Sequence, residues 1–420
     1  MIDVLRSAAN PGPRPHGRLF CGFLVLVGLA GSALAQGPGQ EPPDLAARPR
    51  VTIAVVDIEG DPRHESIRAS ERTLLKAREH PFAAAQVGID EAQVLTRVLK
   101  TDFALERMRV KSPEEVAPAV LAAEQSRSIR FFIVDAPAEA FRALATAVKG
   151  RELLVFNATA QDDWLRRELC APEIVHTAAS LAMRMDALAQ FLVSRKWRDV
   201  LLLRGPLAAD AAMAKAFEQS AKKFGARIIA QKDFRPGTDP REREQNNPAL
   251  LSAVNRDYDV TFVADETFEF AREVPYHTVR ARPVVGSIDL DPVGWDWSFE
   301  RHGAPQINSR FQKATGGRHM SADDWSTWMA VKMVVQATLR TRSTSFADLR
   351  TFILGNAGFD GYKGLAVSVR PWDHQLRQAI FLATPYAVAA SAPLEGFLHR
   401  SNVLDTLGDD EPETPCRLSR

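Results

Sequence analysis

The chain has 420 residues, of which 45% are apolar and 25% charged, and its formal net charge is +1. Ordinary domains cluster near 100–150 residues, so this length indicates two α/β lobes. The near-neutral charge and the absence of a basic patch with interleaved aromatic residues argue against a nucleic-acid partner.

The N-terminus differs from the rest of the chain. Three arginines precede an apolar run over residues 19–29, and the small-residue motif Ala33-Leu34-Ala35 follows. This order is typical of a cleaved secretory signal peptide, here residues 1–35, and predicts an exported protein. An uncleaved membrane anchor is the alternative. Residues 36–50 are rich in proline and glycine, and we expect a flexible leader there.

Two of the three cysteines, Cys170 and Cys416, lie beyond the predicted cleavage site. Because exported compartments are oxidising, this even pair is a disulfide candidate, and two free thiols are the alternative. The sequence contains no CxxC, HExxH or Cys/His cluster, which argues against a zinc site. We therefore predict neither a metal site nor a cofactor.

Strands and helices alternate along most of the chain, which predicts right-handed parallel crossovers. Val51 to Ile58 is a near-continuous β-branched run, typical of a strand buried on both faces. The expected strands are 51–58, 108–110, 129–134, 153–157, 200–203, 227–230, 260–264, 283–288, 365–369 and 379–383. The expected helices are 87–105, one opening at 112–115, 137–148, 182–193, 208–224, 247–255, 268–274, 323–340 and 345–354. Two successive doubly wound units result.

The strand at 153–157 ends in a polar segment, Asn157 to Asp163. Ligands of open α/β sheets bind beyond the carboxyl ends of strands, so this strand end is a candidate wall of a binding site. Glu59, Asp61 and Arg63 follow the first strand in the same way. They either line the cleft or form salt bridges within their loop.

The sequence lacks the usual signatures of nucleotide binding and of serine hydrolases. No G-x-G-x-x-G motif follows the first strand, and neither a Walker phosphate loop nor G-x-S-x-G is present. We therefore assign no catalytic residue and expect a protein that is not an enzyme. A periplasmic hydrolase is the weakest of the alternatives.

The order of these features resembles the type I periplasmic substrate-binding proteins of ABC importers, in the branched-chain amino acid and amide binding group. The segments that carry the resemblance are V-T-I-A-V-V-D at 51–57, the helix at 88–103, N-A-T-A at 157–160, H-T-A at 176–178, D-V-T-F-V-A-D-E at 259–266 and V-V-G-S-I-D at 284–289. The resemblance implies an α/β type I periplasmic-binding fold with two doubly wound lobes, a hinge and a cleft. The implied boundaries are lobe I at 51–177 plus 306–365, lobe II at 178–305 plus 366–395, and a tail at 396–420.

This resemblance also implies a set of ligand-binding residues. The first lobe offers Asn157, Ala158, Thr159 and Thr177, and the second lobe offers Asp265, Glu266, Ser287 and Asp289. Asp265-Glu266 stands where amino-acid binders carry an aromatic residue, and the usual D-x-x-Y-G after the strand at 200–203 is lost. Both departures argue against an α-amino acid ligand.

A narrower resemblance links the chain to binding proteins associated with alcohol dehydrogenases that depend on pyrroloquinoline quinone (PQQ). It is carried by E-G-D-P-R at 59–63, D-D-W-L-R at 162–166, M-R-M-D-A-L-A-Q-F-L at 183–192, W-D-H-Q-L-R-Q at 372–378 and the tail segment 395–412. It implies the solute-binding component of an ABC importer, with a small-molecule ligand, an inner-membrane permease as partner and a link to periplasmic alcohol oxidation. The alternative is an accessory or sensor protein that binds a metal ion, PQQ or a partner dehydrogenase.

Residues 289–300 share several positions with an EF-hand calcium loop. Asp289, Asp291 and Glu300 occupy positions 1, 3 and 12, and Gly294 occupies position 6. Val293 and the preceding proline do not fit that pattern. The alternative is a polar cleft loop in which Trp295 or Trp297 packs on a ligand or on the core.

Overall fold

The computed structural model describes residues 48–65, 78–237, 239–355 and 357–418. The predicted signal peptide and most of the predicted leader lie outside these residues. Within the described residues, five strands form a parallel sheet in the order β2-β1-β3-β4-β5. They are β1 Arg50–Ile58, β2 Asp102–Val110, β3 Phe131–Asp135, β4 Leu154–Asn157 and β5 Ile174–His176.

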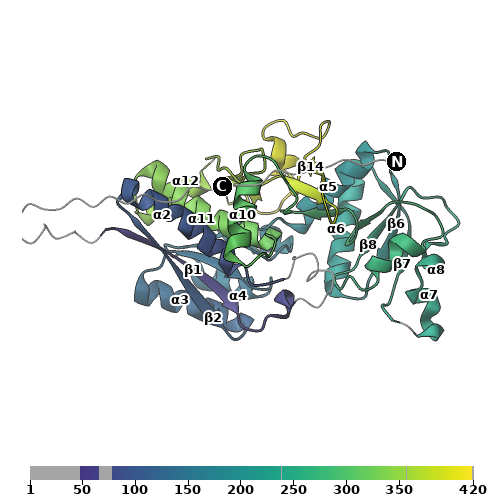
Figure 1. Cartoon of the computed structure of the whole chain (residues 1–420), viewed down its shortest axis with the longest axis horizontal. Helices are drawn as coiled ribbons and strands as arrows, with labels where there is room; N and C mark the ends of the chain where they lie inside the picture. The colour runs from purple at the N-terminus through teal and green to yellow at the C-terminus, as the bar shows by residue number, and fades with distance from the viewer. Residues whose placement is uncertain (1–47, 66–77, 238, 356, 419–420) are drawn as a thin grey trace, which may run out of the picture. The chain divides into compact units, whose positions relative to one another are not determined.

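Helices cover both faces of this first sheet because its central strands are apolar on both sides. Helices α2 (Phe82–Leu99), α11 (Ala322–Thr341) and α12 (Phe346–Leu354) pack in the hydrophobic cluster on one face. Helices α3 (Val116–Arg127) and α4 (Ala140–Val148) pack in the cluster on the other (Figure 1). Sheet and helices together form the first lobe.

A second parallel sheet has the order β7-β6-β8-β9 and forms the second lobe. Its strands are β6 Asp199–Arg204, β7 Arg227–Asp233, β8 Val260–Ala264 and β9 Val284–Gly286. Helices α5 (Leu181–Ser194) and α6 (Ala208–Phe224) contribute to the cluster on one face, and segments around α8 (Pro248–Ser252) and α9 (Val274–His277) to the other. The predicted architecture of two doubly wound sheets is therefore confirmed.

Short elements complete the described chain. The helices are α7 Arg243–Asn246 and α10 Ala304–Ala314, the 3-10 turns are η1 Pro62–His64, η2 Pro113–Glu115, η4 Pro240–Glu242, η5 Ala271–Glu273 and η6 Val403–Thr406, and η3 Leu165–Leu169 is a π-helix. The strands β10 Asp291–Val293, β13 Ile380–Ala383 and β14 Val388–Ala392 form an antiparallel sheet, and β11 Ser368–Val369 pairs with β12 Leu376–Arg377. No helix of the described residues is long and apolar enough to cross a membrane.

The structure corrects the sequence prediction most clearly after α2. The predicted helix continued to residue 105, but α2 ends at Leu99 because Lys100 adopts the left-handed conformation. The strand β2 begins at Asp102 and pairs with β1 along its whole length, where the prediction placed only residues 108–110 in a strand. Pairing with β1 thus overrode the local helical pattern.

The two lobes are connected through a buried polar network. After β5 the chain leaves the first sheet at Thr177, whose carbonyl accepts a hydrogen bond from Gln378 at 2.9 Å. Gln375 donates to the carbonyls of His176 and Ala178 at 3.1 and 3.0 Å. Because buried amides need partners, these bonds fix the crossing segments side by side.

The C-terminal tail is tied to both lobes. Cys416 forms a disulfide with Cys170, which follows η3, with 5.4 Å between the two Cα atoms. Arg167 binds Asp409 at 2.6 Å, and the amide of Gly408 donates to Asp186 of α5 at 2.8 Å. The tail therefore packs against η3 and α5, near the place where the chain passes from the first sheet to the second.

Candidate functional site

The first sheet has a topological switch point between β1 and β3. Strand β2 pairs with one edge of β1, and β3 pairs with the opposite edge. Ligands of doubly wound folds bind in the crevice beyond the carboxyl ends of the strands at such a switch point. Here Asp61, Arg63 and His64 follow β1, and Asp135 is the last residue of β3. Four ionisable side chains therefore meet at the position where this topology places a ligand.

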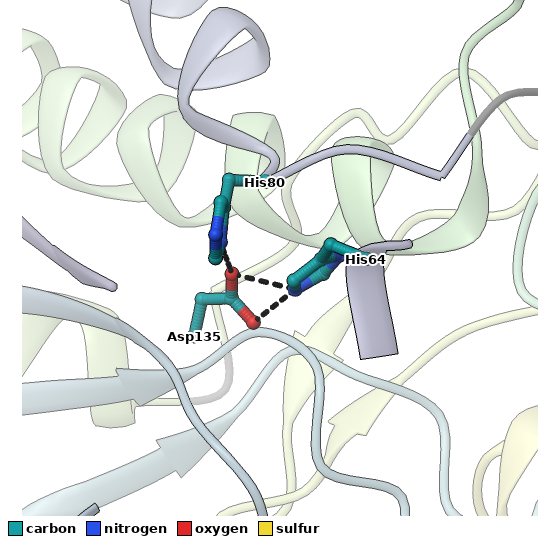
Figure 2. Close-up of side chains that lie close together, drawn as sticks. All are labelled: His64, His80 and Asp135. Atoms are coloured by element: carbon teal, nitrogen blue, oxygen red, sulfur yellow. Dashed lines mark hydrogen bonds and ion pairs between the residues drawn. The ribbon is translucent and has the colours of Figure 1, made fainter. Parts of the chain in front are cut away.

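Asp135 is the centre of this cluster, and its side chain is fully buried. His64 Nε2 lies 2.9 Å from its Oδ1 and 2.8 Å from its Oδ2, and His80 Nδ1 lies 2.8 Å from Oδ2. The two imidazole rings are 4.4 Å apart. Figure 2 shows both rings directed at the carboxylate, one from the turn after β1 and one from the segment that precedes α2.

The other side of the carboxylate is held by Arg63 and Thr159. Thr159 donates its hydroxyl to Oδ1 of Asp135 at 3.0 Å, and Arg63 donates to the same oxygen at 3.1 Å. Arg63 also binds both oxygens of Asp61 and donates to the Thr159 hydroxyl. The guanidinium is therefore shared between two carboxylates, which fixes the orientation of Asp135.

These contacts shift the protonation equilibria of the cluster. Burial raises the pKa of Asp135, but the hydrogen bonds from His64 and His80 outweigh it, and the net pKa is well below its usual range. Burial lowers the pKa of His64, but the bond to Asp135 outweighs it and the net pKa is raised. The contacts thus favour the ionised form of Asp135 and shift His64 toward its cationic form, relative to the free side chains.

Asp323, in the first turn of α11, adds a carboxyl group to this region. Burial, and then the charge of Asp135, raise its pKa to about 7. The side chain lines a small cavity of about 80 Å³, whose walls also include Gln161, Ala178, Ala179, Arg184, Val293, Gly294, Ala322 and Ser326. The cavity is therefore lined by residues of the first lobe, of the segment that crosses between the lobes, and of β10.

The second lobe has a corresponding switch point between β6 and β8, but its polar groups are engaged internally. Asp265 accepts hydrogen bonds from the amides of Phe270 and Ala271 at 3.0 and 2.8 Å and from the Thr267 hydroxyl at 2.7 Å. Ser287 accepts from the amide of Asp265 at 2.9 Å. Both predicted ligand residues therefore stabilise the turn after β8.

The remaining predicted residues of this lobe are more exposed. The Glu266 side chain is 57% exposed and lies 3.5 Å from Arg78, which precedes α2 in the first lobe. Its backbone amide donates to Asp210 at 2.6 Å. Asp289 is exposed and adopts the left-handed conformation. Of the predicted second-lobe set, Glu266 forms a direct contact with the first lobe.

Among the predicted residues of the first lobe, some form internal hydrogen bonds or pack in the core, and one belongs to the Asp135 cluster. Asn157 is buried, donates to the Ala160 carbonyl at 2.8 Å and lies 3.0 Å from His176 Nδ1. Thr177 donates to the Asn157 carbonyl at 3.2 Å, and Ala158 is buried in the first hydrophobic cluster. Thr159 is the member of this group that the structure brings into the Asp135 cluster.

The segment 289–300 does not gather its acidic groups as an EF-hand loop does. Asp291 lies in β10, paired with β13, and its carboxylate binds Arg184 at 3.1 Å. Asp296 accepts from the amide and hydroxyl of Ser298. Trp295 is buried against Trp325 and donates to Asn308. Core packing is therefore the role of this tryptophan.

Sequence reasoning missed four members of the cluster: His64, His80, Asp135 and Asp323. For Asp135 a signal existed, because it follows the apolar run of β3 just as Asn157 ends β4. The two histidines are separated from Asp135 by 71 and 55 residues, so no local spacing connects them. Arg63 was proposed either to line the cleft or to bind within its loop, and it bonds to its loop neighbour Asp61 as well as to Asp135.

Comparison with known proteins bears on the fold of this chain. Residues 112–264 match a protein family described as periplasmic binding protein. A branched-chain amino acid ABC transporter periplasmic ligand-binding protein from Burkholderia xenovorans LB400 superposes with a TM-score of 0.67 at 13% identity, over 88% of this chain and 100% of that chain. The chain has the type I periplasmic-binding fold. No curated protein matches the sequence.

Other solved structures share this type I fold. A leucine-, isoleucine-, valine-, threonine- and alanine-binding protein from Brucella ovis gives a TM-score of 0.63 at 14% identity, over 82% of this chain and 95% of that chain. A solute-binding protein of an ABC transporter from R. palustris, in complex with benzoate, gives 0.57 at 11% identity, over 87% and 99%. At these identities the likeness concerns the fold.

Proposed function

We propose that the protein is the periplasmic solute-binding component of an ABC importer and that it binds a small polar solute at the carboxyl edge of the first sheet. The observation that carries this proposal is the cluster around Asp135, which occupies the β1/β3 switch point. The type I fold supports it, because solved proteins of this fold include a ligand-binding protein and a solute-binding protein of ABC transporters. Closure of the two lobes would present the loaded form to a permease in the inner membrane.

Two members of the predicted ligand set have positions that suit direct contact with a solute. The hydroxyl of Thr159 belongs to the Asp135 cluster, and the carboxylate of Glu266 is exposed beside Arg78 of the first lobe. The internal hydrogen bonds of Asn157, Thr177, Asp265 and Ser287 suit residues that shape the walls. We propose Thr159 and Glu266 as solute contacts on the first and second lobe.

Thermal shift measurements on the mature chain, stripped of bound ligand, test this proposal. The panel contains aliphatic amino acids, aromatic carboxylates, short-chain acids derived from alcohols, and PQQ. A ligand that binds the native state raises the melting temperature in a concentration-dependent manner. We expect one chemical class to do so, and we expect Thr159→Ala to weaken that response, with Thr146→Ala on the exposed face of α4 as the control.

The proposal of a solute site fails if no compound of the panel raises the melting temperature. The proposed contacts fail if a ligand is found but both Thr159→Ala and Glu266→Ala leave its affinity unchanged.

We also propose a link to PQQ-dependent alcohol oxidation. Three of the segments that carry the narrower resemblance contact one another: Arg166 donates to Gln375 at 2.8 Å, and Trp372 donates to the Asp409 carbonyl at 3.3 Å. These segments therefore pack against one another near the Cys170–Cys416 disulfide. Deleting the gene should slow growth of the host on alcohols and leave growth on sugars unchanged. Equal growth of the mutant and its parent on alcohols would contradict the link.

A further inference from the structure

Three side chains that bind transition metals converge at the β1/β3 switch point. His64 comes from η1, His80 from the segment before α2, and Asp135 from the end of β3, and their ligand atoms all lie within 4.8 Å of one another. Among the described residues, this is the group of histidine, cysteine and acidic side chains whose geometry could hold a metal ion. We propose that His64, His80 and Asp135 form a binding site for one divalent first-row transition metal ion such as zinc.

The distances within the cluster suit ligands that share one metal ion. Zinc lies about 2.1 Å from imidazole nitrogen and carboxylate oxygen, so the ligand atoms of a tetrahedral site are separated by roughly 3.4 Å. His64 Nε2 and His80 Nδ1 each lie 2.8 Å from Asp135 Oδ2. A small outward movement of the two rings would admit a cation where the imidazole protons now meet the carboxylate.

The surroundings of Asp135 prepare one of its oxygens for this role. Oδ1 accepts hydrogen bonds from Thr159 and Arg63 at 3.0 and 3.1 Å and lies 2.9 Å from His64 Nε2, whereas Oδ2 faces both imidazoles at 2.8 Å. Hydrogen bonds of this kind orient the ligands of metal sites and are a large part of their affinity. Thr159 and Arg63 therefore act as positioning residues for a carboxylate that presents Oδ2.

The charge of the site also suits a cation. Asp61, Asp135 and Asp323 contribute carboxylates and Arg63 contributes one guanidinium, and all four interact electrostatically. Metal binding requires neutral imidazoles, and in that state the carboxylates outnumber the single guanidinium. A divalent ion would balance this excess in a region that is largely shielded from solvent, where the His64 and His80 side chains are 8% and 18% exposed.

The donor set selects the class of metal. Two imidazoles and one carboxylate suit zinc and neighbouring first-row transition metals, whereas calcium requires six to eight oxygen ligands. Three protein ligands leave a coordination position for water or for a donor atom of a solute. The site lies at the carboxyl edge of the first sheet, but metal binding does not depend on the proposed importer role.

Isothermal titration of zinc into the mature chain tests the proposal. The protein carries no histidine tag and is freed of metal with EDTA before the titration. We expect one zinc ion per chain and no competition from calcium. His64→Gln and His80→Gln should each weaken zinc binding by roughly 100-fold or more, because loss of an outer hydrogen-bond partner alone costs about 10- to 100-fold. Thr159→Val should weaken it by about 10-fold.

A matched control separates this site from adventitious binding. His277 is exposed on α9, and His277→Gln should leave the zinc affinity unchanged. Melting curves in EDTA and in zinc provide a second readout. A ligand variant should lose the zinc-induced rise in melting temperature, whereas a residue with only a structural role would lower both curves equally.

The proposal is overturned if the wild-type chain binds no zinc, or if His64→Gln and His80→Gln bind it as tightly as wild type. In either case the three side chains form a hydrogen-bonded network in which two imidazole N–H groups serve one carboxylate. Should His64→Gln fail to fold, His80→Gln decides the question, because the His80 side chain is the more exposed of the two.

Discussion

The two lobes present acidic residues at equivalent strand ends but use them differently. At the β1/β3 edge, Asp135 is surrounded by the side chains of His64, His80, Arg63 and Thr159. At the β6/β8 edge, Asp265 accepts hydrogen bonds from the backbone amides of the turn that follows it. The first carboxylate brings separate segments together, and the second completes a single turn.

This difference shows how to interpret an acidic residue at a strand end. A carboxylate that caps backbone amides has satisfied its hydrogen-bonding capacity within one segment and has little left for a ligand. A carboxylate that collects imidazole and guanidinium groups concentrates charge and donor atoms. On this basis we propose that the first-lobe edge sets the chemistry of the site.

The largest effect is expected from Asp135→Ala. The change leaves Arg63 and two histidines without their buried carboxylate, and removing one partner of a buried ionic group costs about 3–5 kcal/mol. Urea unfolding in EDTA measures the free energy of unfolding, with Asp90→Ala on the exposed face of α2 as the control. A loss below about 1 kcal/mol would show that the cluster contributes little to the fold.

Asp265→Ala tests the second edge. The amides of Phe270 and Ala271 lose their acceptor, and loss of a capping carboxylate costs about 2 kcal/mol. Zinc affinity and solute affinity should remain close to the wild-type values in the folded variant. If either affinity falls by more than about tenfold, the second edge also contributes to binding.

The pH dependence of stability tests the first edge in its metal-free form. Because the pKa of His64 is raised in the folded state, its contribution is present below the unfolded-state pKa and is lost as pH rises through the folded-state pKa. In EDTA, His64→Gln should therefore destabilise the chain more at pH 5.5 than at pH 8.5. An equal loss at both values would show that the His64–Asp135 bond does not depend on the imidazole charge.

The smallest effect is expected from Glu266→Gln. Its ion pair with Arg78 joins two partly exposed side chains, and such pairs contribute about 0–1 kcal/mol. The free energy of unfolding should change by less than about 0.5 kcal/mol. Small-angle scattering of the apo protein can show whether removing this contact shifts the lobes toward a more open form. A large loss of stability would mean that Glu266 has a structural role like that of Asp265.

Much of the fold could be predicted because its strands are strongly patterned. The apolar runs of β1, β3, β4 and β8 each stop at a polar residue, and their alternation with helices indicates parallel crossovers. Elements that depend on distant partners were missed. Strand β5 has three residues, and β10 is held by pairing with β13 about ninety residues later in the sequence.

The candidate site was harder to predict for the same reason. Thr159 could be named because it follows a predicted strand, but the side chains around it come from residues 61–64, from His80 and from α11. Their meeting depends on strand order, which a single sequence does not specify. Likewise, nothing local distinguishes Asp265, which caps a turn, from Asp135, which collects side chains.

Diffraction at the zinc absorption edge, from crystals of the mature chain grown with one equivalent of zinc, tests the central claim about the first-lobe edge most directly. We expect one anomalous peak about 2.1 Å from His64 Nε2, His80 Nδ1 and Asp135 Oδ2. Zinc that appears only at surface histidines, with the three side chains still hydrogen-bonded to one another, would contradict the claim.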